Sequence, residues 1–295
     1  MNIIICVKTV PNPALPVEFD VKKGTYIDEG WNYILNPADE AALEQALRLK
    51  EQFGGTVTVI TADTVRGNET LVKCLAMGAD NALRIDVPNP AALDSLATAR
   101  ILSRTISRSF FDLVLCGDRS SDRNCGETGS MLAELLNMPV ITSVIQMDIS
   151  ATDNSVTVLR KLEKGARERK RCHLPALLTA DAALNEPRYP TLAGRKKAAR
   201  KEISVIRDNT IAPDPQYTRI ISINRPPPKK IFIPSGNISP AERIRLLIQG
   251  SGAKISGAKS SGTNILEGNP EEIAKKVTAF LKERRLIPEK ASPSS

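Results

Sequence analysis

The chain opens on Asn2-Ile3-Ile4-Ile5-Cys6-Val7, a β-branched run that predicts a buried strand. From residue 2 to about residue 148, similar short apolar runs alternate with helical patterns. This rhythm is typical of a parallel sheet wound by crossover helices. We therefore expect an α/β fold with a Rossmann-like parallel sheet, and its strands are predicted over residues 3–10, 56–62, 82–87, 113–116 and 140–147.

The first helix has the clearest boundaries. Asn36 is a favourable N-cap and Pro37 suits the first helical position. Asp39 and Glu40 complement the positive end of the helix dipole, and Gly54-Gly55 predicts the end of the helix. Further helices are expected over about residues 68–76 and 92–107, and from about residue 126 onward.

The rhythm changes after Ser150. Residues 156–159 and 169–173 flank a polar turn at Gly165 and predict an antiparallel hairpin, followed by a buried strand over residues 174–179. We expect a nucleotide-binding α/β domain over residues 1–205. Residues 206–295 are interpreted as an extended C-terminal arm with a short helix at about 240–249 and a terminal helix at 270–284.

Composition disfavours several classes of function. Lys and Arg number 41 against 33 Asp and Glu, which gives a net charge of +8, and much of the excess lies in Lys164–Lys170 and Arg195–Lys201. Neither run has the interleaved aromatic residues of a base-stacking surface, so no nucleic-acid partner is expected. A single histidine leaves little for acid–base or metal chemistry. No apolar run is long enough to span a membrane.

The five cysteines, at positions 6, 74, 116, 125 and 172, show no CxxC spacing. They fit neither a disulfide framework nor a zinc or iron–sulfur site. No basic leader precedes the first strand, so we expect a reducing, cytoplasmic location. Cys125 is expected to line a ligand or to be buried, because the single histidine, His173, lies in a different segment.

Ligands of open parallel sheets collect beyond the carboxyl ends of the strands, near a switch point in strand order. Three loops lie at such ends, over residues 6–10, 62–64 and 117–129. The third loop leads into a helix and carries glycines and hydroxyl groups that suit a bound phosphate. Its polar residues are equally suited to cap that helix, and spacing alone does not choose between the two. No GxGxxG follows the first strand, and no Walker-type GxxxxGK[ST] is present.

Residues 181–192 follow a predicted buried strand and contain Pro187 and Pro190, which stiffen the segment. A rigid loop with apolar anchors suits docking to a partner. The alternative is a proline-rich crossover whose Leu184 packs into its own domain. The residues alone slightly favour this alternative.

The sequence around this loop resembles the β subunits of electron transfer flavoproteins. The likeness is carried by Leu174-Pro175-Ala176-Leu177-Leu178-Thr179-Ala180-Asp181, then by Leu184-Asn185-Glu186-Pro187-Arg188-Tyr189 and a basic run downstream. It extends to Cys6-Val7-Lys8, Asn36-Pro37, Leu75-Ala76-Met77-Gly78-Ala79-Asp80 and Leu113-Val114-Leu115-Cys116-Gly117. It covers about residues 1–205, and the tail looks longer than is usual for the family.

The resemblance implies an electron carrier subunit without catalytic residues, in a heterodimer whose α subunit holds the redox-active FAD. It implies that the β subunit binds AMP, or a second FAD in electron-bifurcating relatives. The partners implied are donor dehydrogenases, such as acyl-CoA dehydrogenases, and an acceptor oxidoreductase. The implied nucleotide site is Cys6, Asn36, Pro37, Ala38, Asp39, Ala62, Gly117, Asp118, Arg119, Ser120, Ser121, Asp122, Arg123, Asn124, Cys125, Gly126, Glu127 and Thr128. The implied docking loop has Leu184 as its anchor, with Asn185, Glu186, Pro187, Arg188 and Tyr189.

The loop over residues 122–129 departs from the family pattern Asp-Gly-Asp-Thr-x-Gln-Val-Gly. Arg123 stands in place of a glycine and Asn124 in place of a carboxylate, while Cys125 and Thr128 are closer to the AMP-type subunits. Arg123 offers an additional phosphate contact, so the choice between AMP and FAD stays open. A second hypothesis is an ATP-using enzyme on a similar α/β fold. It requires a Ser-Gly-Gly type loop after the first strand, which residues 7–11 lack.

Overall fold

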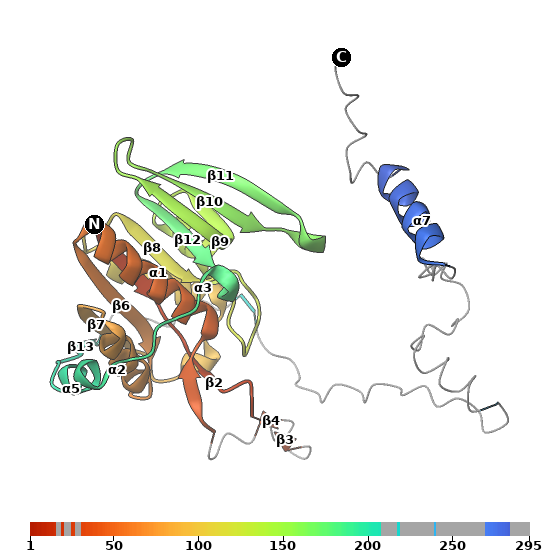
Figure 1. The fold of residues 1–295 in the computed structure, drawn as a ribbon. Helices are drawn as coiled ribbons and strands as arrows, with labels where there is room; N and C mark the ends of the chain where they lie inside the picture. The colour runs from red at the N-terminus through yellow and green to blue at the C-terminus, as the bar shows by residue number, and fades with distance from the viewer. Residues whose placement is uncertain are drawn as a thin grey trace. The chain divides into compact units, whose positions relative to one another are not determined.

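Strand β1 (Asn2–Cys6) lies inside a nine-stranded sheet of the computed structural model (Figure 1). The structure describes residues 1–15, 19–20, 25–26, 31–207, 217–218, 239 and 269–283. In sheet order the strands are β11 (Arg167–His173), β10 (Ser155–Lys161), β9 (Val140–Ser150), β12 (Ala176–Ala180), β8 (Leu113–Gly117), β1, β6 (Thr56–Asp63), β7 (Asn81–Asp86) and β13 (Ser204–Ile206).

The expected α/β fold is confirmed. All neighbouring strands from β9 to β13 in this order are parallel. At the other end, β9, β10 and β11 are antiparallel, so the predicted hairpin is present and extends the same sheet. The chain runs from β1 outward to β6 and β7, then returns to β8 on the opposite side of β1. The order of the strands therefore reverses between β1 and β8, which is the switch point.

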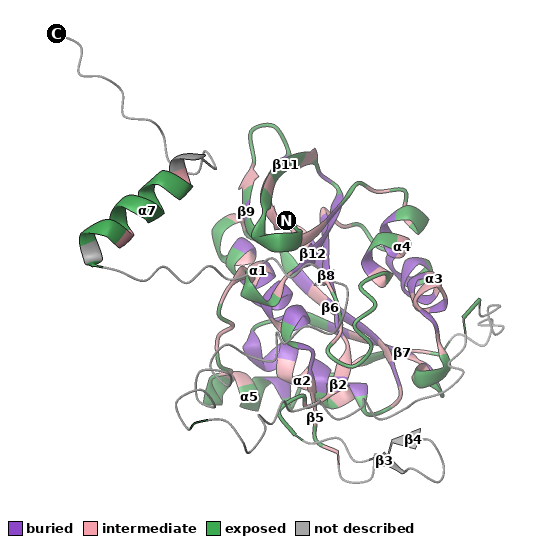
Figure 2. Cartoon of the chain, turned by 90° about the vertical axis from the view of Figure 1, so that its right-hand side faces the viewer, coloured by how far each residue is buried: buried purple, intermediate pink, exposed green. Residues whose placement is uncertain are grey.

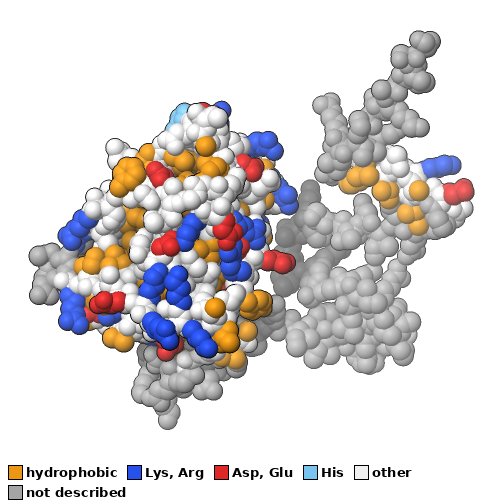
Figure 3. Space-filling view, turned by 60° about the vertical axis from the view of Figure 1, so that its left-hand side comes forward, with side chains coloured by type: hydrophobic (Ala, Val, Ile, Leu, Met, Phe, Trp, Pro, Cys, Tyr) orange, Lys and Arg blue, Asp and Glu red, His pale blue; other side chains and the backbone are white. Residues whose placement is uncertain are grey.

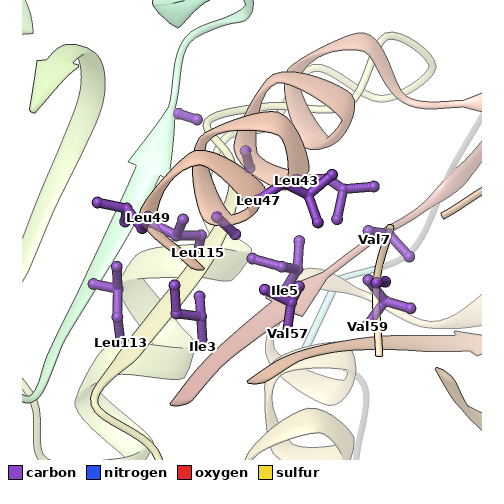
Figure 4. Packing of buried hydrophobic residues seen from close by; sticks show 14 of the residues in the cluster. Ile3, Ile5, Val7, Leu43, Leu47, Leu49, Val57, Val59, Leu113 and Leu115 are labelled. Atoms are coloured by element: carbon purple, nitrogen blue, oxygen red, sulfur yellow. The ribbon is translucent and has the colours of Figure 1, made fainter. Parts of the chain in front are cut away.

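Helix α1 (Pro37–Phe53) has the predicted start and end. Gly54 follows it with a φ of 70°, a conformation that glycine adopts without strain. Leu43 and Leu47 pack on Ile5, Val59 and Leu115 of the sheet, and all five side chains are between 0 and 3% exposed (Figure 4). Burial of this apolar face is the main force that fixes α1 on the sheet.

Helices cover both faces of the sheet (Figure 2). Helices α1 and α2 (Gly67–Met77) belong to one apolar cluster, and α3 (Ser95–Ile106) and α4 (Thr128–Leu135) belong to a second cluster on the other face. The third helix was expected from residue 92. It begins at Ser95 because the Asp94 carboxylate caps it and accepts the N–H of Ala97 at 2.8 Å, after a short 3₁₀ turn η1 (Pro90–Ala92).

The first strand is shorter than predicted. It ends at Cys6, and Thr9–Pro11 forms a separate strand β2 that pairs antiparallel with β5 (Tyr33–Leu35). The expected continuation to residue 10 was wrong because the backbone N–H of Lys8 is bonded to the Asp39 carboxylate rather than to a neighbouring strand. A second small ladder joins β3 (Phe19–Asp20) and β4 (Thr25–Tyr26).

Two elements after residue 191 were not predicted either. The basic run after residue 191 forms helix α5 (Leu192–Ala198), and β13 adds a parallel edge strand to β7. Gly194 explains how closely α5 lies on α2, since a Cβ there would clash with the carbonyl O of Ala76. Figure 3 shows Lys and Arg side chains gathered on the side of the molecule where Figure 1 places α5.

The chain divides into two units, Met1–Arg225 and Pro226–Ser295. In the second unit, α7 (Pro270–Glu283) confirms the predicted terminal helix. The helix expected at 240–249 and the Pro226–Pro228 run lie outside the described residues. None of the helices in the described part of the chain is both long and apolar enough to cross a membrane.

Candidate functional site

The carboxyl ends of β1 and β8 form the switch point of the sheet, and Asp39 ties them together. This residue of the first turn of α1 is 5% exposed. Its Oδ2 accepts the N–H of Lys8, which follows β1, and its Oδ1 accepts the N–H of Gly117, the last residue of β8, both at 2.8 Å. A Cβ at Gly117 would clash with this carboxylate, so glycine is required there. The beginning of α1 is thus fixed against both strand ends.

Asn36 joins the same site in a role that the sequence did not predict. Its side chain makes no cap hydrogen bond to α1. Instead, Oδ1 accepts the N–H of Ser121 and Nδ2 donates to the carbonyl O of Arg119, both at 3.1 Å, and the residue is 2% exposed. Asn36 therefore occupies the predicted N-cap position, but its side chain binds the β8 loop instead of the helix because that loop offers the amide a donor and an acceptor together.

The loop over residues 117–127 is mostly exposed and crosses the end of β1. Lys8 extends over it, with Nζ 2.6 and 2.7 Å from the two carboxylate oxygens of Asp122 and 3.4 Å from Oγ of Ser120. Sequence reasoning missed Lys8 as a site residue. The one available signal was its position in a loop at the carboxyl end of the first strand.

Arg123, the expected extra phosphate contact, points elsewhere. Its guanidinium donates to the carbonyl oxygens of Ala91 and Leu93, ahead of α3. Cys125 is exposed, with Sγ 3.6 Å from the carbonyl O of Arg123, so it is not a buried cysteine. Arg123 and Cys125 therefore both lie on the exposed part of this loop.

Cys6 and Ala62 lie near the carboxyl ends of β1 and β6, two neighbouring strands in the middle of the sheet. Cys6 lies beside Cys116 in register, and both thiols are buried on the face that α3 and α4 cover. Burial raises the pKa of Cys6 to about 12, and the negative charge of Asp39 acts in the same direction. The Cys6 thiol is therefore neutral near pH 7. Ala62 is partly buried near the end of β6, next to β1.

The remaining predicted residues of this site differ in how far they are buried. Ala38 is buried beside Gly117, whereas Pro37 is exposed. Asp118, Asn124, Gly126, Glu127 and Thr128 stay on the loop and at the start of α4. The structure thus brings Asn36, Asp39, Gly117, Arg119 and Ser121 into direct contact, and it places Cys6 and Ala62 on adjoining strands.

The predicted docking loop is clamped to the middle of α1. Arg188 donates from Nε to Oε2 of Glu44 at 2.8 Å and from Nη2 to Oε1 of Glu44 at 3.1 Å, and it also pairs with Glu51. Arg48 donates to the carbonyl O of Glu186 at 3.2 Å, and Asn185 donates to that of Ala41 at 3.1 Å. This loop is therefore held rigidly although it is not a regular element.

Glu44 is the buried member of this clamp, with a side chain that is 3% exposed. Burial alone would raise its pKa, but the hydrogen bonds from Arg188 and Arg48 outweigh burial and hold the pKa of Glu44 below its ordinary value. A buried carboxylate with three charge-assisted bonds fixes position more strongly than an exposed pair.

The apolar side chains of the loop differ in exposure. Leu184, at the end of the 3₁₀ turn η3 (Ala182–Leu184), is half-buried and packs against the same cluster as α1. Tyr189 is 91% exposed, and Leu192, the first residue of α5, is 71% exposed. The side chains available to another protein are therefore Tyr189 and Leu192.

Comparison with known proteins gives a consistent family. The family described as electron transfer flavoprotein domain matches residues 23–210. The chain belongs to the electron transfer flavoprotein family. Electron transfer flavoprotein subunit beta of Bacillus subtilis is 34% identical over 232 residues, which cover 77% of this chain and 89% of the relative. The human subunit beta is 33% identical over 231 residues, with the same coverage of 77 and 89%.

A third relative covers the tail as well. Caffeyl-CoA reductase-Etf complex subunit CarD of Acetobacterium woodii is 34% identical over 289 residues, which cover 97% of this chain and 100% of the relative. As a β subunit of this family, the chain takes part in electron transfer together with a flavin. The family match favours the electron-carrier hypothesis over the ATP-using alternative.

The clamp of this β subunit gives a first prediction. Glu44→Ala leaves Arg188 without its buried partner, so it should lower the free energy of unfolding by about 1–3 kcal/mol and speed trypsin cleavage after Arg188. Glu51→Ala removes a partner that is 60% exposed and should cost less than about 1 kcal/mol. Urea denaturation and timed proteolysis measure both effects. Equal effects of the two substitutions would contradict the assigned role of Glu44.

A second prediction concerns pH. Burial raises the pKa of Asp39 from 3.8 to about 6, although bonds from Lys8, Asn36 and Gly117 oppose the shift. Because the folded pKa is the higher one, proton binding by Asp39 stabilises the fold fully below about pH 4, and this contribution is lost as the pH rises through about 6. Between these values, the free energy of unfolding should fall more for the wild type than for Asp39→Asn. Parallel pH profiles of the two proteins would refute the shift.

Proposed function

We propose that this chain works in a heterodimer whose α subunit carries the redox-active FAD, and that it holds an adenine nucleotide at the β1–β8 switch point. The carrying observation is a set of hydrogen bonds that fixes the β8 loop over the strand ends: Asp39 accepts the N–H of Gly117, and Asn36 accepts the N–H of Ser121 and donates to the carbonyl O of Arg119. These bonds satisfy the buried polar groups and leave the donors of the loop exposed. Ser120, Ser121 and Lys8 suit a phosphate there.

The nucleotide is AMP, or a second FAD if the complex bifurcates electrons. Either one would sit among the residues expected from the family resemblance, from Cys6 and Ala62 on the strands to residues 117–128 on the loop. Gly126 has a φ of 71°, and a Cβ there would lie 3.2 Å from the carbonyl O of Asp118, so the loop keeps a tight turn before α4. When bound, the nucleotide supplies structural support, and the FAD of the α subunit supplies the redox chemistry.

The subunit is proposed to be an electron carrier rather than an enzyme in its own right. It would pass electrons from a dehydrogenase, such as an acyl-CoA dehydrogenase, to an acceptor oxidoreductase. The relative in the caffeyl-CoA reductase-Etf complex supports an enzyme of CoA esters as a partner. Five free thiols, three of them buried, support a reducing cytoplasm as the location.

The C-terminal arm is proposed to pack on the α subunit. In α7, Ile273, Val277, Phe280 and Leu281 recur at helical spacing and form one apolar stripe. Val277 is 39% and Phe280 is 50% exposed. A stripe of this kind suits a groove on a second protein.

Docking of the donor is proposed to use the loop over residues 181–192 and the start of α5. Leu184 was the expected anchor, but it packs on its own domain. A docking anchor acts through the surface that it buries in the partner, and part of the Leu184 side chain is already buried in its own domain. We therefore assign the apolar contact to Leu192, supported by Tyr189, and assign Leu184 to hold the loop on α1.

The nucleotide content of the complex tests the proposed function. The chain, co-expressed with its α subunit, should purify as a heterodimer with a flavin spectrum. Extraction should release either one FAD with one AMP, or two FAD. A stable monomer that acquires no flavin, or a heterodimer with no nucleotide besides the FAD of the α subunit, would refute it.

Docking is tested with two leucines. Leu192→Ala should slow reduction by the donor dehydrogenase about tenfold or more, since truncating an exposed anchor removes binding energy without disturbing the fold. Leu184→Ala should instead lower the free energy of unfolding by about 1–3 kcal/mol. Val65→Ala, which truncates a side chain that is 68% exposed on another loop, is the control. If only Leu184→Ala slowed reduction and its stability were unchanged, Leu184 and not Leu192 would be the docking anchor.

A further inference from the structure

Lys8 lies where β1 ends and the chain turns away from the sheet. Its backbone N–H is held by Asp39 at 2.8 Å, so the start of its side chain is fixed at the switch point. The four-carbon stem then carries the ammonium over the end of the sheet to the β8 loop. The side chain is 42% exposed, so the charge lies at the surface of the candidate nucleotide site.

The ammonium contacts two residues of that loop. Both carboxylate oxygens of Asp122 lie within 2.7 Å of Nζ, and Oγ of Ser120 lies at 3.4 Å. This ion pair spans the switch point, because Lys8 follows β1 and Asp122 follows β8. Burial tends to raise the pKa of Asp122, but the hydrogen bonds from Lys8, Ser120 and the backbone of Arg123, together with the charge of Lys8, outweigh burial and lower the pKa.

The other cations of the β8 loop are engaged elsewhere. Arg123 donates to the carbonyl oxygens of Ala91 and Leu93, and Arg119 pairs with its neighbour Asp118 at 3.3 Å. Among the described residues of the loops after β1 and β8, Lys8 is the cation that reaches from one strand end to the other.

Another anion can easily replace the Asp122 carboxylate as the partner of Lys8. The two side chains are 42 and 26% exposed, so water screens their attraction and the pair contributes little to stability. A phosphate monoester carries nearly two negative charges, against one on a carboxylate, and accepts charge-assisted hydrogen bonds from an ammonium. A phosphate that arrives at this edge therefore replaces the carboxylate at little cost.

We infer that Lys8 binds the phosphate group of the nucleotide and that Asp122 competes with this phosphate for the same ammonium. The inference rests on the proposed nucleotide site and names the residue that selects a nucleotide over its nucleoside. Ser120 is the second donor to the phosphate. Asp122 limits affinity, and it also keeps the ammonium placed over the strand ends.

The test is a titration of the heterodimer, freed of adenine nucleotide, with AMP and with adenosine by calorimetry. Lys8→Met should weaken AMP binding about tenfold or more, because a hydrogen bond from a charged donor is lost, and should leave adenosine binding unchanged. Lys8→Arg should retain most of the AMP affinity. Asp122→Asn should strengthen AMP binding up to about fivefold by freeing the ammonium.

The matched control is Lys50→Met. Lys50 forms an ion pair of similar geometry with Asp80, at 2.6 Å and with side chains 27 and 34% exposed, at the far end of α1. It should leave binding of both ligands unchanged. Unaltered AMP binding by Lys8→Met, or an equal loss of AMP and adenosine binding, would overturn the inference alone. A wild-type complex that binds neither ligand would overturn the nucleotide site and the inference with it.

Discussion

The carboxylate of Asp39 accepts the backbone N–H groups of Lys8 and Gly117, and it thereby joins the start of α1 to the ends of β1 and β8. A carboxylate that is 5% exposed is expensive to bury unless donors surround it, so these bonds leave little freedom in how the three elements meet. Asn36 then adds the β8 loop to the same assembly. The strand ends and the start of α1 are consequently held in fixed positions at the switch point. The β8 loop that crosses them carries the exposed hydrogen-bond donors.

Helix α1 also positions a second part of the molecule, the loop that contains Arg188. Its apolar face packs on the central strands, its first turn organises the switch point, and Glu44 in its middle holds the loop that contains Arg188. The proposed nucleotide site and the proposed docking segment are therefore built on one rigid element. Packing places both sites and leaves Leu192 and Tyr189 on the surface.

Family membership gives the general role of this chain, whereas the contacts of its own residues show how the β8 loop is held. Matches over most of the chain establish an electron transfer flavoprotein β subunit, and the relative from Acetobacterium woodii extends the match across the tail. The structure shows what the residues of the β8 loop contact in this chain. Arg123, which the sequence offered as a phosphate contact, is bonded to backbone carbonyls near α3, whereas Lys8 meets Asp122 across the switch point.

Local signals in the sequence determined most of the fold. Pro37 and Gly54 marked both ends of α1, alternating apolar runs marked the parallel strands, and the motif around Leu184–Tyr189 marked the family. Tertiary structure decided what those signals could not, because the decisive contacts join residues far apart in the chain. Asp39 meets Gly117 across 78 positions, Lys8 meets Asp122 across 114, and Glu44 meets Arg188 across 144. Leu184 is half-buried because the loop lies on α1, and Leu192 is exposed at the start of α5, which lies on α2. No periodicity within the segment encodes that arrangement.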